Sequence, residues 1–572
     1  MRFFEIGILL LLTASSLPVS VGSPNAGKSF DLATQKLVLA DYLNPWSNPT
    51  FSREWGGWGW HECGTSHDPD YVYPNGTRDI ASIFYPLIGP YDAGEEAVMK
   101  YHIRLAQASG LDAFVVDWDG ITGFYDFPRI NRNFMKMLKL AELQNFGVAI
   151  DYDAMRYYVG HTGPGVKLIP DRTKALRQVH DDLTYAIKQF GPSPAYLKFH
   201  DQPVIFVFGA GGGSMTRDEW GDIITQLSNE GLRAFYVDMQ GQTRKLYPYF
   251  KGYFPWLGAG EEDLSPNSAS FINDWAAVLR RSAQYMDIKW GLAVWPGFDN
   301  SPVSAWCAKN SSGSYWIQIL DRKNGLLYNQ TWTAVMRNKP SFIFIVTWND
   351  WNEATIIEPA RQYGYKYLYA TELYASQFKG QKPDYDGIPV PLEIYDATSA
   401  IQQASKDGRT VGLDIAQQYL QNAETAFDFT HDYGSAASFA RKAVDAAKAS
   451  DYPKSYYEAK GLLAEAESLK TNATAANFTS TQAKTLFNEG VSAFWQAEYA
   501  YRQGDYNATI TYAQAAVRFF EQAFQAERTA RTFPLVQLRF HYEYLAAAAV
   551  IILIVLAAPR LRRNAKRNGE LT

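Results

Sequence analysis

Two carboxylates three residues apart, Asp350 and Glu353, are the side chains with the clearest chemical potential in this sequence. Residues at i and i+3 point to opposite faces of an extended strand but to the same face of a helical turn. A turn here would therefore direct both carboxylates toward one ligand. Hydrolysis of a glycosidic bond requires two carboxyl groups beside it, one to deliver a proton and one to act as nucleophile or base. The alternative is that these two acidic residues are not catalytic and lie at the N-terminus of a helix, where negative charge interacts favourably with the helix dipole.

A buried strand should position this pair. Residues 342–346 read FIFIV, an apolar run of β-branched and aromatic residues that is typical of a strand buried on both faces. The chain then becomes polar and acidic. In a (β/α)8 barrel the active-site residues follow the C-terminal ends of the strands, so this pattern places Asp350 and Glu353 at such a rim.

Short apolar runs of the same kind recur earlier in the chain. Segments with apolar residues at helical spacing, such as 95–109 and 174–190, separate them. Eight alternations over roughly 340 residues predict a (β/α)8 TIM barrel with enlarged loops, an α/β fold. The expected strands are 37–40, 113–116, 148–150, 204–208, 234–237, 253–254, 292–294 and 342–346.

Polar and aromatic residues gather where these runs end, and in a barrel those ends share one rim. An acidic and aromatic rim suits a neutral polyhydroxylated ligand, because tryptophan faces can stack on sugar rings. The same tryptophans could instead plug the barrel mouth. The expected substrate-binding residues are Trp60 from the glycine-rich run 55–62, and Trp118, Asp119, Tyr253, Trp295, Trp348 and Asn349 from the strand ends.

Residues 347–359, TWNDWNEATIIEP, resemble the W-N-E-W-x-E-G-T-x-I-E-P signature of glycoside hydrolase family 99, the endo-α-mannosidases and endo-α-mannanases. Upstream, PGFD at 296–299 and the spacing from Arg322 to Trp332 are similar to segments of that family. The resemblance covers about residues 36–380. It implies a TIM-barrel enzyme that cleaves a glycan or polysaccharide without a cofactor or a metal.

By motif position, the resemblance gives Asp350 the role of helping the substrate's 2-hydroxyl attack the anomeric carbon through an epoxide-like intermediate. Glu353 becomes the general acid/base, and Glu358 joins the substrate-binding residues. The family has Glu where this chain has Asp350. A side chain one methylene shorter moves the carboxylate by about 1 Å, and a misplacement of that size can cost about a hundredfold in rate. The family also often has two aromatics where this chain has Trp118 and Asp119.

Two alternative functions stay open at this point. The signature W-N-D-Y-G-E-S of family 71, the α-1,3-glucanases, resembles residues 348–353 in carrying Asp and Glu at this spacing. Alternatively, the barrel could be a non-catalytic, glycan-binding component of a surface layer. The presence of both carboxylates favours an enzyme.

Composition changes beyond the barrel. A proline-containing segment at 381–398 predicts a linker, and an Ala-, Gln- and Glu-rich region at 399–532 with helical periodicity predicts a helical domain. The break at 502–506 resembles the turn of a helical hairpin. The helical domain could hold the barrel away from a membrane or bind a protein partner.

The two ends of the chain predict export. Residues 1–23 have the pattern of a signal peptide. Residues 542–559 predict a transmembrane anchor, and residues 560–572 predict a basic cytoplasmic tail after it. We therefore expect a single-pass cell-surface protein with its bulk outside. Cys63 and Cys307 could form one disulfide in that environment. The net charge of −5, with no basic cluster before the C-terminus, gives no nucleic-acid footprint.

Overall fold

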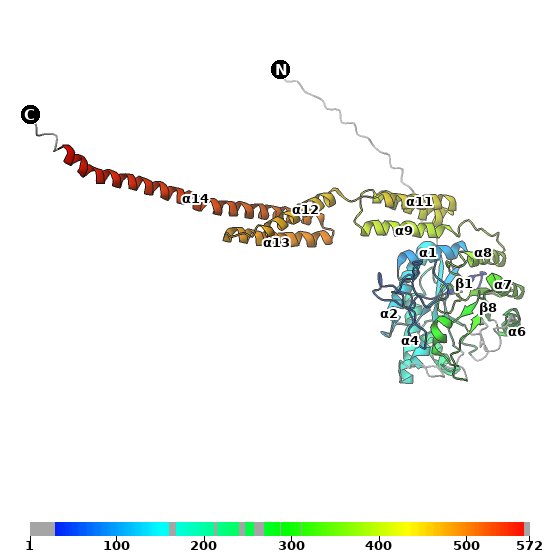
Figure 1. Cartoon of the computed structure of the whole chain (residues 1–572). Helices are drawn as coiled ribbons and strands as arrows, with labels where there is room; N and C mark the ends of the chain where they lie inside the picture. Colours follow the sequence, from blue (N-terminus) through cyan, green and yellow to red (C-terminus); the bar gives the residue numbers. More distant parts are fainter. Residues whose placement is uncertain are drawn as a thin grey trace, which may run out of the picture. The chain divides into compact units, whose positions relative to one another are not determined.

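The computed structural model describes residues 29–159, 168–210, 214–239, 246–256, 268–286, 288–309 and 312–565 (Figure 1). The predicted signal peptide and residues 566–572 of the predicted tail lie outside the described residues. The chain divides into two units, one of Met1–Thr398 with Leu420–Arg441 and one of Ser399–Tyr419 with Lys442–Thr572.

Parallel strands in the first unit close into an eight-stranded barrel, as predicted. Neighbours follow the order β3-β2-β1-β11-β8-β7-β6-β5, and pairing of β3 with β5 closes the ring. The strand expected at 253–254 is present as the two-residue β7, which pairs with both of its neighbours. The strands are β1 (Val38–Tyr42), β2 (Ala113–Trp118), β3 (Gly147–Tyr152), β5 (Gln202–Val207), β6 (Phe235–Asp238), β7 (Gly252–Tyr253), β8 (Lys289–Val294) and β11 (Phe342–Ile345). A short β4 (Lys198–Phe199) pairs with β5 in the antiparallel sense.

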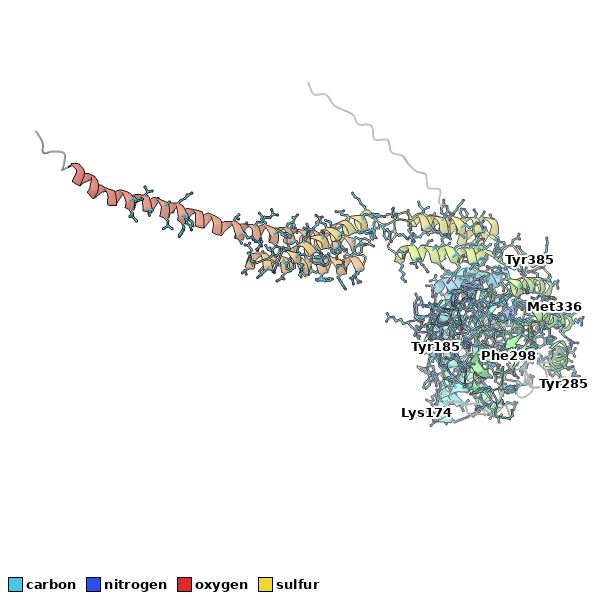
Figure 2. The ribbon with its side chains drawn as sticks, viewed as in Figure 1. Lys174, Tyr185, Tyr285, Phe298, Met336 and Tyr385 are labelled. Carbon is cyan, nitrogen blue, oxygen red and sulfur yellow. A yellow bond between two sulfur atoms is a disulfide. The ribbon has the colours of Figure 1, made fainter. Side chains whose placement is uncertain are left out.

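Helices surround the barrel in Figure 1, and side-chain caps define where several of them begin. Thr216 and Glu219 form a reciprocal capping box at the start of α5, and Asp171 caps α4 by accepting from the Lys174 amide. Figure 2 marks α4 by Tyr185 and α7 by Met336. The helices are α1 (Glu96–Ala108), α2 (Phe127–Gln144), α3 (Met155–Val159), α4 (Arg172–Gln189), α5 (Arg217–Asn229), α6 (Ser268–Met286), α7 (Leu326–Asn338) and α8 (Lys366–Lys379).

Aromatic side chains fill the barrel interior. Phe206 on β5 contacts Phe344 on β11 at 5.7 Å between ring centroids, although these strands are not neighbours. Phe254 stacks on Phe344 at 4.4 Å. The contacts cross the barrel, so its centre is a packed core and the functional surface must lie at a rim.

Two long excursions cover the rim at the C-terminal ends of the strands. One is the segment 43–95 between β1 and α1. The other lies between β8 and α7 and contains β9 (Phe298–Asp299), η1 (Ser301–Cys307), β10 (Ile319–Leu320) and η2 (Lys323–Gly325). Cys63 and Cys307, whose pairing the sequence left open, form a disulfide that joins the two excursions.

In the described residues beyond α8, the regular elements are helices. The turn predicted at 502–506 is confirmed, because α13 ends at Arg502 and α14 begins at Tyr506. The segment 381–398 was expected to be a linker, but the helix α9 begins inside it at Val390. Pro391 does not prevent this helix, because it falls in the first turn, where proline is tolerated. These helices are α9 (Val390–Lys406), α10 (Leu413–Thr425), η3 (Ala426–Thr430), α11 (Tyr433–Ala449), α12 (Lys454–Ala475), α13 (Thr481–Arg502) and α14 (Tyr506–Ala565).

The second unit has a hydrophobic core of its own between α12, α13 and α14. Phe494 on α13 and Phe520 on α14 are buried there among alanines. A Cβ at Gly490 would lie 2.6 Å from the Phe520 ring, so this glycine permits the close approach of the two helices.

The expected membrane anchor at 542–559 belongs to α14. Over the part of the chain that the structure describes, no helix is apolar over a sufficient length to cross a membrane, and the anchor finds no support there.

Candidate active site

Asp350 and Glu353 lie in a tight turn beyond the C-terminal end of β11. The Asp350 amide donates to Thr347 Oγ1 at 2.9 Å, and the Glu353 amide donates to Asp350 Oδ1 at 3.1 Å. The Thr347 amide donates to Thr355 O at 3.0 Å, so the segment folds back on itself. The turn keeps the two acidic residues adjacent, as their spacing predicts.

Side chains on both flanks fix this turn to the rest of the barrel. Asn349 accepts from the Leu43 amide at 2.7 Å and donates to Leu43 O at 2.8 Å, which ties the turn to the chain after β1. Asn352 donates to Gly57 O and Ala81 O at 3.0 and 2.8 Å. Arg322 donates to the carbonyls of residues 354 and 356. The backbone of the turn is thus held independently of any ligand.

A buried polar network lies beneath the turn and is centred on Glu358, which is 1% exposed. One carboxylate oxygen lies 3.1 Å from His102 Nε2. The other accepts from Tyr91 Oη at 2.7 Å and from Trp351 Nε1 at 3.2 Å. Tyr91 Oη also accepts from Asn349 Nδ2 at 3.1 Å. Glu358 therefore positions the turn from below and offers no free oxygen to a ligand.

More carboxylates converge on the same rim from the ends of β1, β2 and β3. Burial raises the pKa of Asp41 well above its ordinary value, and the charges of Asp151, Asp117, Asp350 and Glu353 raise it further. Burial also raises the pKa of Asp119, and the charge of Asp117 raises it further. The Asp117, Asp119 and Asp153 carboxylates lie within 4.8 Å of one another, and Arg156 on α3 forms an ion pair with Asp153. Arg156 supplies positive charge to an otherwise acidic rim.

Asp350 and Glu353 influence each other's ionisation. Burial raises the pKa of Asp350 well above its ordinary value, and the neighbouring charge of Glu353 raises it further. Burial also raises the pKa of Glu353, while a hydrogen bond from Trp306 and the charge of Arg156 act in the opposite direction. Two adjacent buried carboxyls cannot easily ionise together. The pair therefore retains a proton at a pH where isolated carboxyls are ionised.

Two tryptophans of the excursions stand beside Glu353. Trp306 of η1 donates from Nε1 to Glu353 Oε1 at 3.0 Å. The Trp60 ring meets the Trp306 ring edge-on, with centroids 5.3 Å apart, and Trp60 is half-buried. Of the residues expected to bind substrate, Trp60 and Asp119 are those that lie with the carboxylates.

The remaining expected substrate-binding side chains are buried in structural positions. Trp118 packs between α2 and α4, where its Nε1 donates to Asn131 and its ring stacks on Tyr185. Tyr253 donates to the Phe250 carbonyl. The ring of Trp348 packs on Phe114. None of these side chains presents a surface to a ligand, and the same holds for Trp295, Asn349 and Glu358.

Sequence reasoning missed Trp306 and Arg156. Trp306 precedes Cys307, so a disulfide that joins two rim loops was a signal that its neighbours reach the rim. Arg156 follows the acidic end of β3 by a few residues, a place where a cation could have been expected.

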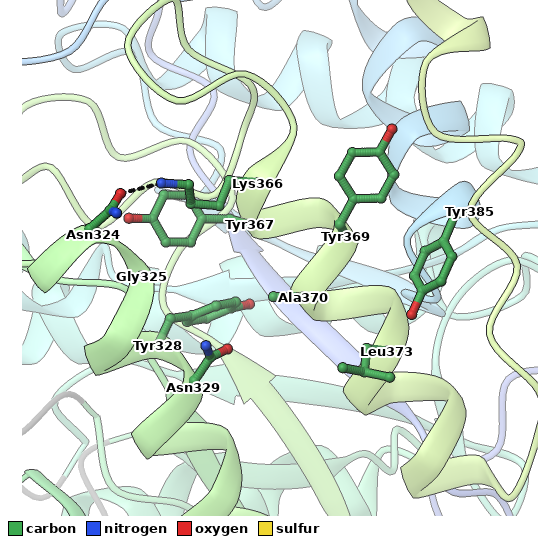
Figure 3. A pocket seen from close by; sticks show the side chains of 10 residues that line it. All are labelled: Asn324, Gly325, Tyr328, Asn329, Lys366, Tyr367, Tyr369, Ala370, Leu373 and Tyr385. Atoms are coloured by element: carbon green, nitrogen blue, oxygen red, sulfur yellow. Dashed lines mark hydrogen bonds between the residues drawn. The ribbon is translucent and has the colours of Figure 1, made fainter.

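A pocket of about 570 Å³ lies on the outside of the barrel between α7 and α8 (Figure 3). Tyr328, Tyr367, Tyr369 and Tyr385 dominate its lining, together with Lys366 and asparagines. It has no carboxylate among its lining residues, so it lacks the pair of carboxyl groups that glycoside hydrolysis uses. The rim is the better candidate for an active site.

Known proteins match the barrel part of the chain. A sequence profile described as glycosyl hydrolase family 99 matches residues 33–385, which is more than half of the chain. The glycoprotein endo-alpha-1,2-mannosidase of Mus musculus is 21% identical over 349 residues, a match that covers 56% of this chain and 67% of that protein. The Rattus norvegicus protein of the same name is 21% identical over 341 residues, covering 56% and 68%. The solved structure of the GH99 endo-alpha-mannosidase from Bacteroides thetaiotaomicron shares 20% identity, covers 62% of this chain and 99% of that one, and has a TM-score of 0.47.

Proposed function

This chain belongs to glycosyl hydrolase family 99 and is a glycoside hydrolase, and we propose that it cleaves an α-mannosidic bond within a glycan or polysaccharide, using Asp350 and Glu353 as its catalytic pair. The observation that carries this proposal is the turn after β11, which holds the two carboxyls side by side at the acidic rim.

The ionisation of the pair supports the proposed roles. Glycoside hydrolysis needs one group that gives a proton and one that is charged, and a pair that retains one proton supplies both. Glu353 would protonate the departing glycosidic oxygen, and Asp350 would take a proton from the sugar 2-hydroxyl or from water. These roles require the retained proton on Glu353 and a charged Asp350 when the substrate is bound. Because the two acids titrate as a pair, a hydroxyl that donates to Asp350 would shift the proton to Glu353.

The acidic rim supports a neutral sugar as substrate. Carboxylates accept hydrogen bonds from hydroxyl groups, and the Asp117, Asp119 and Asp153 cluster offers several acceptors at one place. The names of the two rodent relatives point to an α-1,2-mannosidic linkage.

Cleavage of an α-glucan is the second candidate function. Asp350 favours it, because family 71 carries Asp at this position of its signature whereas the family 99 signature has Glu.

Hydrolysis assays on a panel of α-mannans and α-glucans, with the first-formed anomer identified by NMR, test the proposal. Glu353→Gln keeps the side-chain volume but cannot donate the proton, so the rate should fall by about 10² to 10⁴. Asp350→Asn should be comparably damaging. Circular dichroism and thermal unfolding of both variants provide the control for folding. Undiminished hydrolysis in both variants would show that Asp350 and Glu353 are not the catalytic pair. Hydrolysis of α-glucans alone would show that the substrate is an α-glucan and not an α-mannoside.

We also propose that the protein is exported and acts at the cell surface. The pattern of residues 1–23 and the Cys63–Cys307 disulfide support an oxidising compartment outside the cytoplasm. Recovery of the protein in the cytoplasm with residues 1–23 still attached would contradict this proposal.

A further inference from the structure

Trp306 has a position that neither the sequence motif nor family membership assigns. It is 48% exposed, yet its Nε1 donates to Glu353 Oε1 at 3.0 Å. One edge of the indole thus contacts the carboxyl that we assign as the acid, while much of the ring faces outward. Large exposed aromatic rings beside a polar group are suited to stacking on sugars.

The loop that carries Trp306 is held in an unusual backbone conformation. Ser304, Ala305, Trp306 and Cys307 have φ values from 45° to 63°, a region that non-glycine residues seldom adopt. Such residues persist only where the surrounding structure fixes them, and they cluster at functional sites. Here the Cys63–Cys307 disulfide and a 2.5 Å hydrogen bond between the hydroxyls of Thr65 and Ser304 fix the loop.

We propose that Trp306 is a positioning residue for Glu353 and that, together with Trp60, it forms the aromatic wall of the subsite for the departing sugar. This inference rests on the proposed function. A general acid lies next to the glycosidic oxygen of the leaving group, so side chains around Glu353 face the sugar that departs. Trp60 extends the wall, because its ring lies 5.3 Å from that of Trp306.

The hydrogen bond also sets the charge on Glu353. An N–H donor stabilises a carboxylate over the neutral acid, and the Trp306 bond accordingly opposes the rise in the Glu353 pKa that burial causes. Among the described residues, Asp350, Asp41 and Arg156 are charged groups that act on Glu353, and Glu62 lies beside Cys307 in the loop that carries Trp306. Loss of the donor should therefore favour protonated Glu353.

Trp306→Phe tests this role, because it keeps a six-membered aromatic ring and removes the five-membered ring that carries the Nε1–H donor. Trp316→Phe is the matched control, since Trp316 lies in the same excursion and is 37% exposed, while Glu353 receives its hydrogen bond from Trp306. On whichever glycoside of the panel the wild type cleaves, the basic limb of the kcat/KM profile should move up by about one pH unit in Trp306→Phe. It should stay in place in Trp316→Phe.

Trp306→Ala tests the stacking wall. It should shift the same limb and also raise KM by about tenfold, because the ring surface is lost as well. Equal KM values in the Ala and Phe variants would remove Trp306 from the subsite. If the basic limb of the kcat/KM profile does not shift in either variant, Trp306 does not influence the ionisation of Glu353.

A readout without turnover separates this inference from the proposed function. In protein labelled with 5-fluorotryptophan, the ¹⁹F resonance that disappears in Trp306→Phe belongs to Trp306. That resonance should titrate with pH in the otherwise unchanged protein and stop titrating in Glu353→Gln, while the Trp316 resonance stays constant. A Trp306 resonance that ignores pH, or still titrates in Glu353→Gln, would overturn the contact. Absence of hydrolysis on the whole panel would instead overturn the proposed function and leave this measurement valid.

Discussion

Asp350 is one methylene shorter than the glutamate in the family 99 signature, and the turn is built around that length. Its Oδ1 accepts from the Glu353 amide at 3.1 Å, while its own amide donates to Thr347. A carboxylate on a longer side chain would leave this amide and reach further into the rim. The shorter residue is therefore part of the local geometry of the turn.

Asp350→Glu should consequently lower the rate, by about a hundredfold, because the carboxylate moves by about 1 Å. kcat on the substrate that the wild type cleaves is the measurement, with thermal unfolding to show that the fold is kept. Equal or higher activity on α-mannosides would mean that the turn accepts glutamate and that the site is a drifted family 99 site.

The two excursions over the rim act together because one covalent bond joins them. The first excursion carries Trp60 and the second carries Trp306. The disulfide joins Cys63 and Cys307, which lie close to these two tryptophans in the chain. The first excursion contains no helix or strand, and the second contains only the short elements β9, η1, β10 and η2. The bond therefore determines how the aromatic wall meets Glu353.

Replacement of Cys63 and Cys307 by serine should raise KM several-fold and shift the basic limb of the pH profile in the same direction as Trp306→Phe. Unfolding should become easier by about 2 to 4 kcal/mol, because the link closes a loop with a sequence separation of 244 residues. Steady-state kinetics and denaturant titrations measure the two effects. Wild-type kinetics in the double variant would show that the loops hold Trp306 without the bond, and treatment of this variant with a reductant should change nothing further.

At the scale of the whole molecule, the segment Leu420–Arg441 belongs to the same unit as the barrel. Arg104 on α1, which is 4% exposed, makes a two-pronged ion pair with Asp428 at 2.8 and 2.7 Å and a further contact with Glu424 at 3.0 Å. A buried guanidinium needs such partners, because its desolvation is costly. This pairing ties a segment beyond the barrel sequence to a barrel helix.

Asp428→Ala should destabilise the first unit by about 3 kcal/mol, because it leaves a buried charge without its main partner. Glu393→Ala is the control, since its pair with Arg441 is exposed and should contribute less than about 1 kcal/mol. Thermal or denaturant unfolding of the two variants gives the comparison. Similar losses in both would mean that Arg104 finds another partner or reaches water.

The sequence by itself determined the barrel and the candidate pair. Apolar runs such as 342–346 alternate with helical periods, and this pattern is local, so it can be read without knowing the fold. The same is true of the spacing of Asp350 and Glu353 and of the helical break at 502–506. Family signatures add to this reading because they are also local strings.

Only the tertiary structure decided which way the side chains at the strand ends point. Trp118 and Asp119 are neighbours in the chain, yet the tryptophan packs between helices while the aspartate joins the rim. Glu358 belongs to the same motif as Glu353, but Tyr91, His102 and Trp351 enclose it. Trp306 reaches Glu353 from 47 residues away. These outcomes depend on contacts between distant segments, and neither periodicity nor composition encodes the direction of a side chain after its strand has ended.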